Sequence, residues 1–98
     1  MSSTVVIRYR TKPEAAEENA RLVAAVYAAL AETDPGHLRY ITYRLADGVT
    51  FVHVAQRDAD ANPLADLPEF AEFQRNLADR CVEMPQPSDA TVVGSYNG

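Results

Sequence analysis

Residues 49–58 read VTFVHVAQRD, and this stretch decides how the chain folds. The composition is that of a β-strand, and strand alternation places Phe51, His53 and Ala55 on one face and two valines on the other. A strand that is apolar on both faces is usually covered on both sides. His53 is the one ionisable residue inside the strand, so its imidazole needs a hydrogen-bond partner or must border a cavity.

The remaining sequence supplies the other elements of a βαββαβ order. Apolar residues at strand or helix spacing predict strands over residues 4–11, 38–45, 49–58 and 90–96, and helices over residues 13–33 and 68–81. A polar connection is expected over residues 58–61, and Asn62-Pro63 is typical of the start of a short helical turn. The Met84-Pro85-Gln86-Pro87 stretch predicts an extended linker before the last strand.

The element order and the turns predict a ferredoxin-like α+β fold. Asp47-Gly48 between two strand-like runs is a strong hairpin signal. Short, right-handed connections then give a four-stranded antiparallel sheet with both helices on one face and the first and third strands at its centre. Because those strands are apolar on both sides, we predict a homodimer in which two sheets pack face to face into a dimeric α+β barrel. We expect one domain over residues 1–98.

Composition argues against several kinds of partner. The net charge is −5, and phosphate binding needs a concentrated basic surface, so we expect neither nucleic acid nor an anionic membrane as a partner. No signal peptide or membrane-spanning run is recognisable, and the one cysteine, Cys81, cannot form an intrachain disulfide, which predicts a cytoplasmic protein. The two histidines lie far apart and no nucleotide-binding motif is present, so neither a metal nor a cofactor is expected.

His53 is the leading candidate for chemistry. With a pKa near neutrality, an imidazole can take a proton from a phenolic substrate or orient that substrate. The alternative is a core imidazole that is hydrogen-bonded to a tyrosine or to the backbone. Arg57 follows on the same strand face, either as a charge that stabilises an anion at the mouth of a pocket or as a solvated strand-end residue.

Aromatic side chains are the candidates for holding a substrate. Tyr27 lies on the first helix, Phe51 shares a strand face with His53, and Phe70 and Phe73 lie on the second helix. Such side chains either form the apolar wall of a ligand cavity or pack as simple core.

The chain resembles the antibiotic biosynthesis monooxygenase domain of the dimeric α+β barrel superfamily. The resemblance covers nearly the whole chain and rests on the element order, the Lys12-Pro13 turn, the run Val54-Ala55-Gln56-Arg57-Asp58 and the pattern Pro68-x-Phe70-x-x-Phe73. This family includes cofactor-independent oxygenases of phenolic polyketides, haem-degrading enzymes and quinol oxygenases, and the superfamily also includes isomerases and cyclases.

The resemblance also implies where a site would lie. Oxygenases of the family have a pocket between sheet and helices, with a polar residue, commonly Asn, in the third strand and often a Trp four positions later. Those places fall on His53 and Arg57. Haem-degrading members carry a His near the start of the second helix, and the matching place is Leu64.

We therefore predict a cofactor-independent monooxygenase for a small aromatic or quinol-like compound, with His53 as base or orienter and Arg57 as electrostatic helper. An electron-rich phenolate can transfer an electron to dioxygen, so the protein must only deprotonate, orient and exclude water. Two alternatives stay open. One is an isomerase or cyclase that uses His53 without oxygen, and the other is a non-catalytic dimeric protein for small-molecule binding or interaction. A cavity beside His53 would speak against a purely structural histidine.

Overall fold

The computed structural model describes residues 2–58 and 62–97. Its elements, in chain order, are β1 (Ser2–Thr11), η1 (Pro13–Ala15), α1 (Ala16–Thr33), β2 (Leu38–Arg44), β3 (Thr50–Asp58), η2 (Pro63–Asp66), α2 (Pro68–Arg75), α3 (Leu77–Arg80) and β4 (Cys81–Ala90), where η marks a 3₁₀ helix. Of the connection expected over residues 58–61, residues 59–61 lie outside the described part of the chain.

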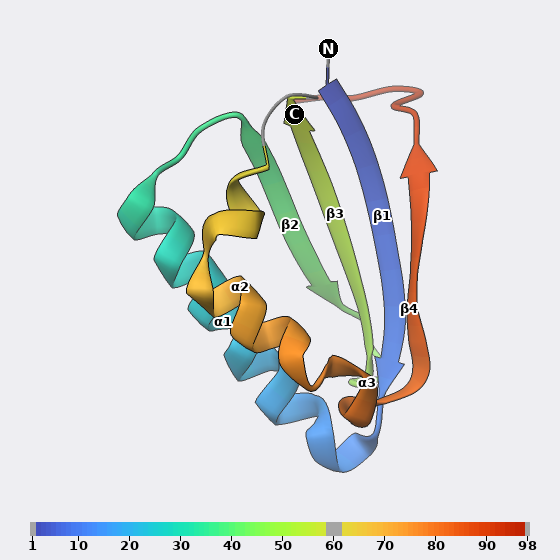
Figure 1. The fold of residues 1–98 in the computed structure, drawn as a ribbon. Helices are drawn as coiled ribbons and strands as arrows, with labels where there is room; N and C mark the ends of the chain where they lie inside the picture. The colour runs from blue at the N-terminus through green and yellow to red at the C-terminus, as the bar shows by residue number, and fades with distance from the viewer. Residues whose placement is uncertain (1, 59–61, 98) are drawn as a thin grey trace.

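The four strands form one antiparallel sheet in the order β2-β3-β1-β4. The ferredoxin-like fold and the central position of β1 and β3 are therefore confirmed. Figure 1 shows that α1 and α2 lie together over one face of this sheet, and no helix of the described residues covers the other face. We call these the helix face and the outer face.

The start and end of α1 follow local sequence signals. Pro13 lies at the first position of η1, where its missing N–H costs nothing, and Glu17 and Glu18 lie in the first turn of α1, where the helix dipole favours negative charge. At the other end, Asp34 adopts a left-handed conformation and its N–H donates to the carbonyl oxygen of Leu30 at 2.8 Å. The predicted helix over residues 13–33 is confirmed, with a 3₁₀ turn at its beginning.

The last strand differs from the prediction. β4 covers Cys81–Ala90, so the segment with Pro85 and Pro87 is part of the sheet, while residues 91–97 are outside any strand. Because β4 is an edge strand, a proline in it need not remove a ladder hydrogen bond. The prediction of a linker over residues 84–87 followed by a strand over residues 90–96 was therefore wrong.

The second helix is also shorter than predicted. Asn76 leaves the helical conformation, with φ −119° and ψ 26°, and separates α2 from the single turn of α3. The chain is already extended at Cys81, which was expected to end the helix.

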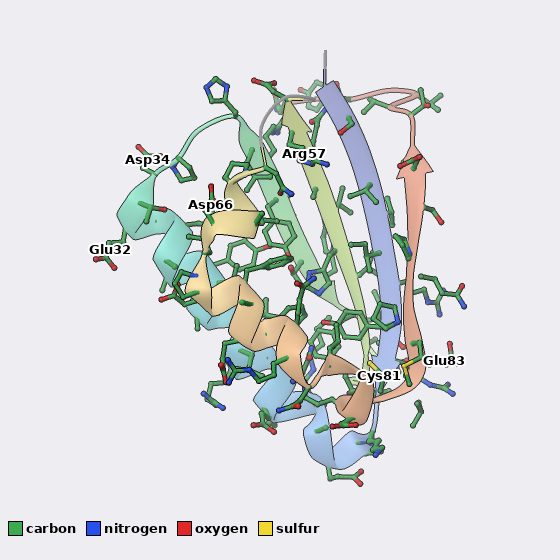
Figure 2. All side chains as sticks on the ribbon, viewed as in Figure 1. Glu32, Asp34, Arg57, Asp66, Cys81 and Glu83 are labelled. Atoms are coloured by element: carbon green, nitrogen blue, oxygen red, sulfur yellow. The ribbon has the colours of Figure 1, made fainter. Side chains whose placement is uncertain are left out.

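The two faces of the sheet differ in their cover. On the helix face, Tyr9, Val26 and Phe51 are almost completely buried, and Figure 2 shows side chains lying between the sheet and the helices. On β2, Ile41 and Tyr43 remain 49% and 51% exposed. Three half-buried valines, Val6, Val52 and Val54, continue the outer face across the central strands.

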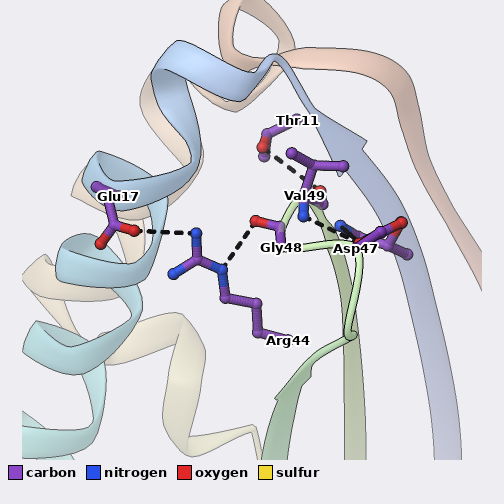
Figure 3. Close-up of polar contacts among 7 residues, drawn as sticks. Thr11, Glu17, Arg44, Asp47, Gly48 and Val49 are labelled. Atoms are coloured by element: carbon purple, nitrogen blue, oxygen red, sulfur yellow. Dashed lines mark hydrogen bonds and ion pairs between the residues drawn. The ribbon is translucent and has the colours of Figure 1, made fainter.

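The hairpin between β2 and β3 is held by the side chain of Asp47 (Figure 3). Its carboxylate accepts the N–H groups of Val49 at 3.0 Å and Thr50 at 2.9 Å, and also the Thr50 hydroxyl at 2.5 Å. Arg44 ties the same turn to α1, because it donates to the carbonyl oxygen of Gly48 and pairs with Glu17 at 3.0 Å. The predicted Asp47-Gly48 hairpin is confirmed.

Asp47→Ala should remove part of the acid sensitivity of this fold. The hydrogen bonds from Thr50 and Val49 lower the pKa of Asp47 to about 2, so the carboxylate stabilises the folded state above its unfolded pKa of about 4. That contribution is lost as the pH falls through the folded pKa of about 2. Chemical denaturation between pH 5 and pH 2 measures it, and Asp66→Ala is the control. Equal pH dependence in wild type and Asp47→Ala would contradict the assignment.

Candidate functional site

A cavity of about 420 Å³ lies between the helix face of the sheet and α2. Its wall is mostly apolar, with residues from β1, β2, β3, β4, η2, α2 and α3. The lining includes Tyr9, Tyr40, His53, Arg57, Leu64, Phe70 and Phe73. The volume falls in the range of pockets that hold small organic ligands.

His53 borders this cavity and has hydrogen bonds at both ring nitrogens. Its Nε2 lies 2.8 Å from the Tyr9 hydroxyl. Its Nδ1 lies 2.5 Å from the Tyr40 hydroxyl and 3.1 Å from Oγ1 of Thr42. The side chain is only 3% exposed, so the imidazole has the partners that burial requires and also touches the cavity.

The hydrogen bonds continue behind Tyr9 into α1 and α3. Nδ2 of Asn19 donates to the Tyr9 hydroxyl at 2.9 Å, and Nε of Arg80 donates to Oδ1 of Asn19 at 3.1 Å. A second guanidinium nitrogen of Arg80 donates to the carbonyl oxygen of Phe73 at 2.7 Å. We call the connected side chains of Arg80, Asn19, Tyr9, His53, Tyr40 and Thr42 the His53 network.

Sequence reasoning did not identify Asn19 or Arg80. Asn19 has no exposed surface and lies one and two turns before Val23 and Val26, on the buried face of α1. A polar residue at a core position of an amphipathic helix was the available signal. Arg80 gave no such signal, because the sequence does not show that α2 breaks at Asn76 and turns this side chain inward.

Burial sets the protonation states in the site. It lowers the pKa of His53 to about 4, which keeps the imidazole neutral at pH 7. Burial also raises the pKa of Tyr9 and of Tyr40, although the Asn19 hydrogen bond partly offsets the increase for Tyr9. Both phenols are therefore protonated around a neutral imidazole.

The structure places only some of the other predicted site residues at the cavity. Arg57, Phe70 and Phe73 line the cavity with His53, and Figure 2 shows Arg57 toward the end of β3 near the N-terminus of β1. Phe51 lies outside the lining and stacks on Tyr9 with ring centroids 5.6 Å apart. Tyr27 also lies outside it, where it stacks on Tyr40 and shares a separate hollow of about 330 Å³.

Solved structures with the same fold come from several organisms. A mutant of SnoaB from Streptomyces nogalater, described as a cofactor-independent oxygenase, is 23% identical, with a TM-score of 0.72 over 99% of this chain and 98% of that chain. PA3566 from Pseudomonas aeruginosa is 19% identical, with a TM-score of 0.74 over 95% of each chain. A conserved protein from Methanosarcina mazei Go1 is 14% identical, with a TM-score of 0.75 over 92% of this chain and 91% of that chain.

The family assignment rests on a match between the sequence and a family model. The family model described as antibiotic biosynthesis monooxygenase matches residues 2–76, which contain the first three strands, α1 and α2. This chain therefore belongs to the antibiotic biosynthesis monooxygenase family. No curated protein sequence matches it.

In residues 2–58 and 62–97, no group of three or more His, Cys, Asp or Glu side chains could hold a metal ion. None of the helices in the described part of the chain combines the length and the apolar character needed to cross a membrane.

Acidification should destabilise the protein through His53. Its pKa is about 4 in the folded state and about 6.5 in the unfolded state, so the unfolded chain binds a proton first as the pH falls. The loss of folding free energy begins below pH 6.5, is complete near pH 4 and amounts to about 3 kcal/mol. Urea denaturation at pH 7 and pH 4 measures it.

The comparison variants are His53→Asn and His37→Asn. His53→Asn should be less stable at pH 7 and should lose much less stability on acidification. His37 is exposed, so His37→Asn should lose as much folding free energy on acidification as the wild type does. If His53→Asn keeps the full loss between pH 6.5 and pH 4, the buried imidazole is not its origin.

Proposed function

We propose that this protein is a cofactor-independent monooxygenase that oxidises a small aromatic or quinol-like compound in the cavity beside His53. One observation carries the proposal: a neutral imidazole and two protonated tyrosine hydroxyls meet at an apolar cavity of about 420 Å³. Family membership supports the same reaction class, as does the likeness in fold to SnoaB.

The proposed reaction begins with removal of a phenolic proton. A neutral imidazole can accept it, and the resulting phenolate is rich enough in electrons to reduce dioxygen by one electron. Recombination of the two radicals and loss of water convert a ring CH₂ group and O₂ into a carbonyl group and H₂O. The balance is complete without an external reductant, so the protein has to bind, deprotonate and exclude water.

The cavity wall suits a flat aromatic substrate. Phe70 and Phe73 lie with their ring centroids 6.2 Å apart, and Phe73 also packs against the imidazole of His53 at 5.5 Å. In the proposed complex these rings hold the substrate by aromatic contact, while Arg57 favours the anionic form from the wall of the cavity.

Oxygen uptake with a panel of anthrones and hydroquinones tests the activity. With an anthrone, the wild type should consume one O₂ for each ring CH₂ group converted into a carbonyl, and His53→Ala should reduce kcat by about 10²–10⁴-fold because the base is lost. His37→Ala is the control, since His37 is exposed and pairs with Asp58 away from the cavity. Product formed under strict anaerobiosis would reject the oxygenase and favour an isomerase or cyclase.

We also propose that the protein acts as a homodimer formed through the outer face of the sheet. Ile41, Tyr43 and Val54 give this face an apolar surface that one copy leaves partly exposed. Two such faces are self-complementary under a two-fold axis and would form the barrel predicted from the sequence. Contiguous apolar surface of this kind is typical of a protein interface.

A charge on the outer face should weaken the dimer. Ile41→Asp places an unpaired carboxylate in the proposed interface and should raise the dimer dissociation constant by about 10-fold or more. Ala28→Asp introduces the same charge on the exposed side of α1 and is the matched control. Sedimentation velocity over a concentration series measures both. A wild type that stays monomeric at high concentration would reject the interface.

A further inference from the structure

We propose that Arg80 fixes the direction of every hydrogen bond between itself and His53, so that His53 takes the substrate proton through the hydroxyl of Tyr9. The direction of the hydrogen bonds follows from the network alone. The proton transfer rests in addition on the proposed function. Arg80 does not contact His53 and is not itself among the residues that line the cavity, so it acts as a positioning residue.

The guanidinium of Arg80 can only donate hydrogen bonds. A guanidinium has five N–H donors and no acceptor, so the atom of Asn19 that faces Nε of Arg80 must be the carbonyl oxygen. The amide nitrogen of Asn19 therefore points to Tyr9 and donates to its hydroxyl at 2.9 Å. Arg80 is only 6% exposed, and its bond to the Phe73 carbonyl oxygen holds the guanidinium in place.

The hydrogen bond from Asn19 sets the direction of the Tyr9 hydroxyl hydrogen. Among the described residues, the Tyr9 hydroxyl has two partners, Asn19 and His53. It accepts from Asn19, so its own hydrogen has one remaining acceptor, Nε2 of His53 at 2.8 Å. The reverse direction would leave the hydroxyl hydrogen of a side chain that is 1% exposed without an acceptor in the described structure.

The imidazole tautomer follows from the same direction. Nε2 accepts from Tyr9, so the ring hydrogen of neutral His53 lies on Nδ1. Nδ1 then donates toward the Tyr40 hydroxyl at 2.5 Å and Oγ1 of Thr42 at 3.1 Å. The nitrogen of His53 that can accept a proton is therefore Nε2, and it is hydrogen-bonded to the Tyr9 hydroxyl.

A substrate proton can reach Nε2 by a two-part transfer. Tyr9 lines the cavity, and its oxygen has a second lone pair that can accept a phenolic O–H from the substrate. The substrate proton moves to the Tyr9 oxygen while the Tyr9 proton moves to Nε2 of His53. The products are a substrate phenolate and an imidazolium, and Tyr9 is a neutral phenol before and after the transfer. No electrons are exchanged in this step.

Nitrogen-15 NMR of histidine-labelled full-length protein tests the direction without a substrate. The wild type should show His53 as a single neutral tautomer at pH 7, with hydrogen on Nδ1 and none on Nε2. Arg80→Gln replaces a group that only donates by an amide that can either donate to Asn19 or accept from it. Both neutral tautomers of His53 should therefore appear. Arg75→Gln, on the exposed side of α2, should retain the wild-type spectrum. His37 gives an exposed reference signal.

A wild-type spectrum with hydrogen on Nε2 would overturn the proposal, and this result does not depend on whether Arg80→Gln folds. A single, unchanged Nδ1–H tautomer in a folded Arg80→Gln variant would overturn the role of Arg80.

Kinetics of Tyr9→Phe test the proton transfer. The variant should lose about 10²–10⁴-fold in kcat with little change in KM for the substrate, because it keeps the ring but not the relaying hydroxyl. A wild-type kcat in Tyr9→Phe would overturn the transfer through Tyr9. If the wild type oxidises no phenol at all, the proposed function fails, while the tautomer still decides the direction of the hydrogen bonds.

Discussion

A neutral imidazole at the centre of a buried strand is the constraint on which the rest of this structure depends. His53 can be accommodated only because its neighbours supply a hydrogen-bond partner at each ring nitrogen. Tyr9 comes from β1 and Tyr40 from β2, the two strands that flank β3. The network then crosses to α1 through Asn19, so a single polar chain connects the sheet with the helices that cover it.

The same residues explain why the core does not close over the histidine. The space beside His53 is bordered by aromatic rings, by aliphatic side chains and by Pro85 and Pro87 of the edge strand. Rings and prolines have few rotamers with which to fill a gap, and the polar atoms of Tyr9, His53 and Tyr40 already have partners. The pocket and the hydrogen bonds are therefore two results of one arrangement.

The sequence predicted what local physics determines. The Asp47-Gly48 hairpin, the first helix and the two faces of β3 follow from contacts within a few residues, and all three are as expected. The position of β4 could not be predicted in this way, because prolines are tolerated there only through the strand's place at the sheet edge. Asn19 and Arg80 were not identified from the sequence for a similar reason. Their contact joins residues 61 positions apart, and no pattern within one helix indicates which residue the partner is.

The choice of arginine at position 80 has a physical cost and a physical consequence. Desolvating a guanidinium is unfavourable, and its described hydrogen-bond partners, Asn19 and the Phe73 carbonyl, are neutral. Arg80 also borders a polar surface hollow whose lining carries both signs of charge, with Glu18, Glu72 and Asp79 beside Lys12 and Arg21. A neutral amide would avoid the desolvation cost, but it would leave the direction of the chain of hydrogen bonds undetermined, and with it the nitrogen on which His53 carries its proton.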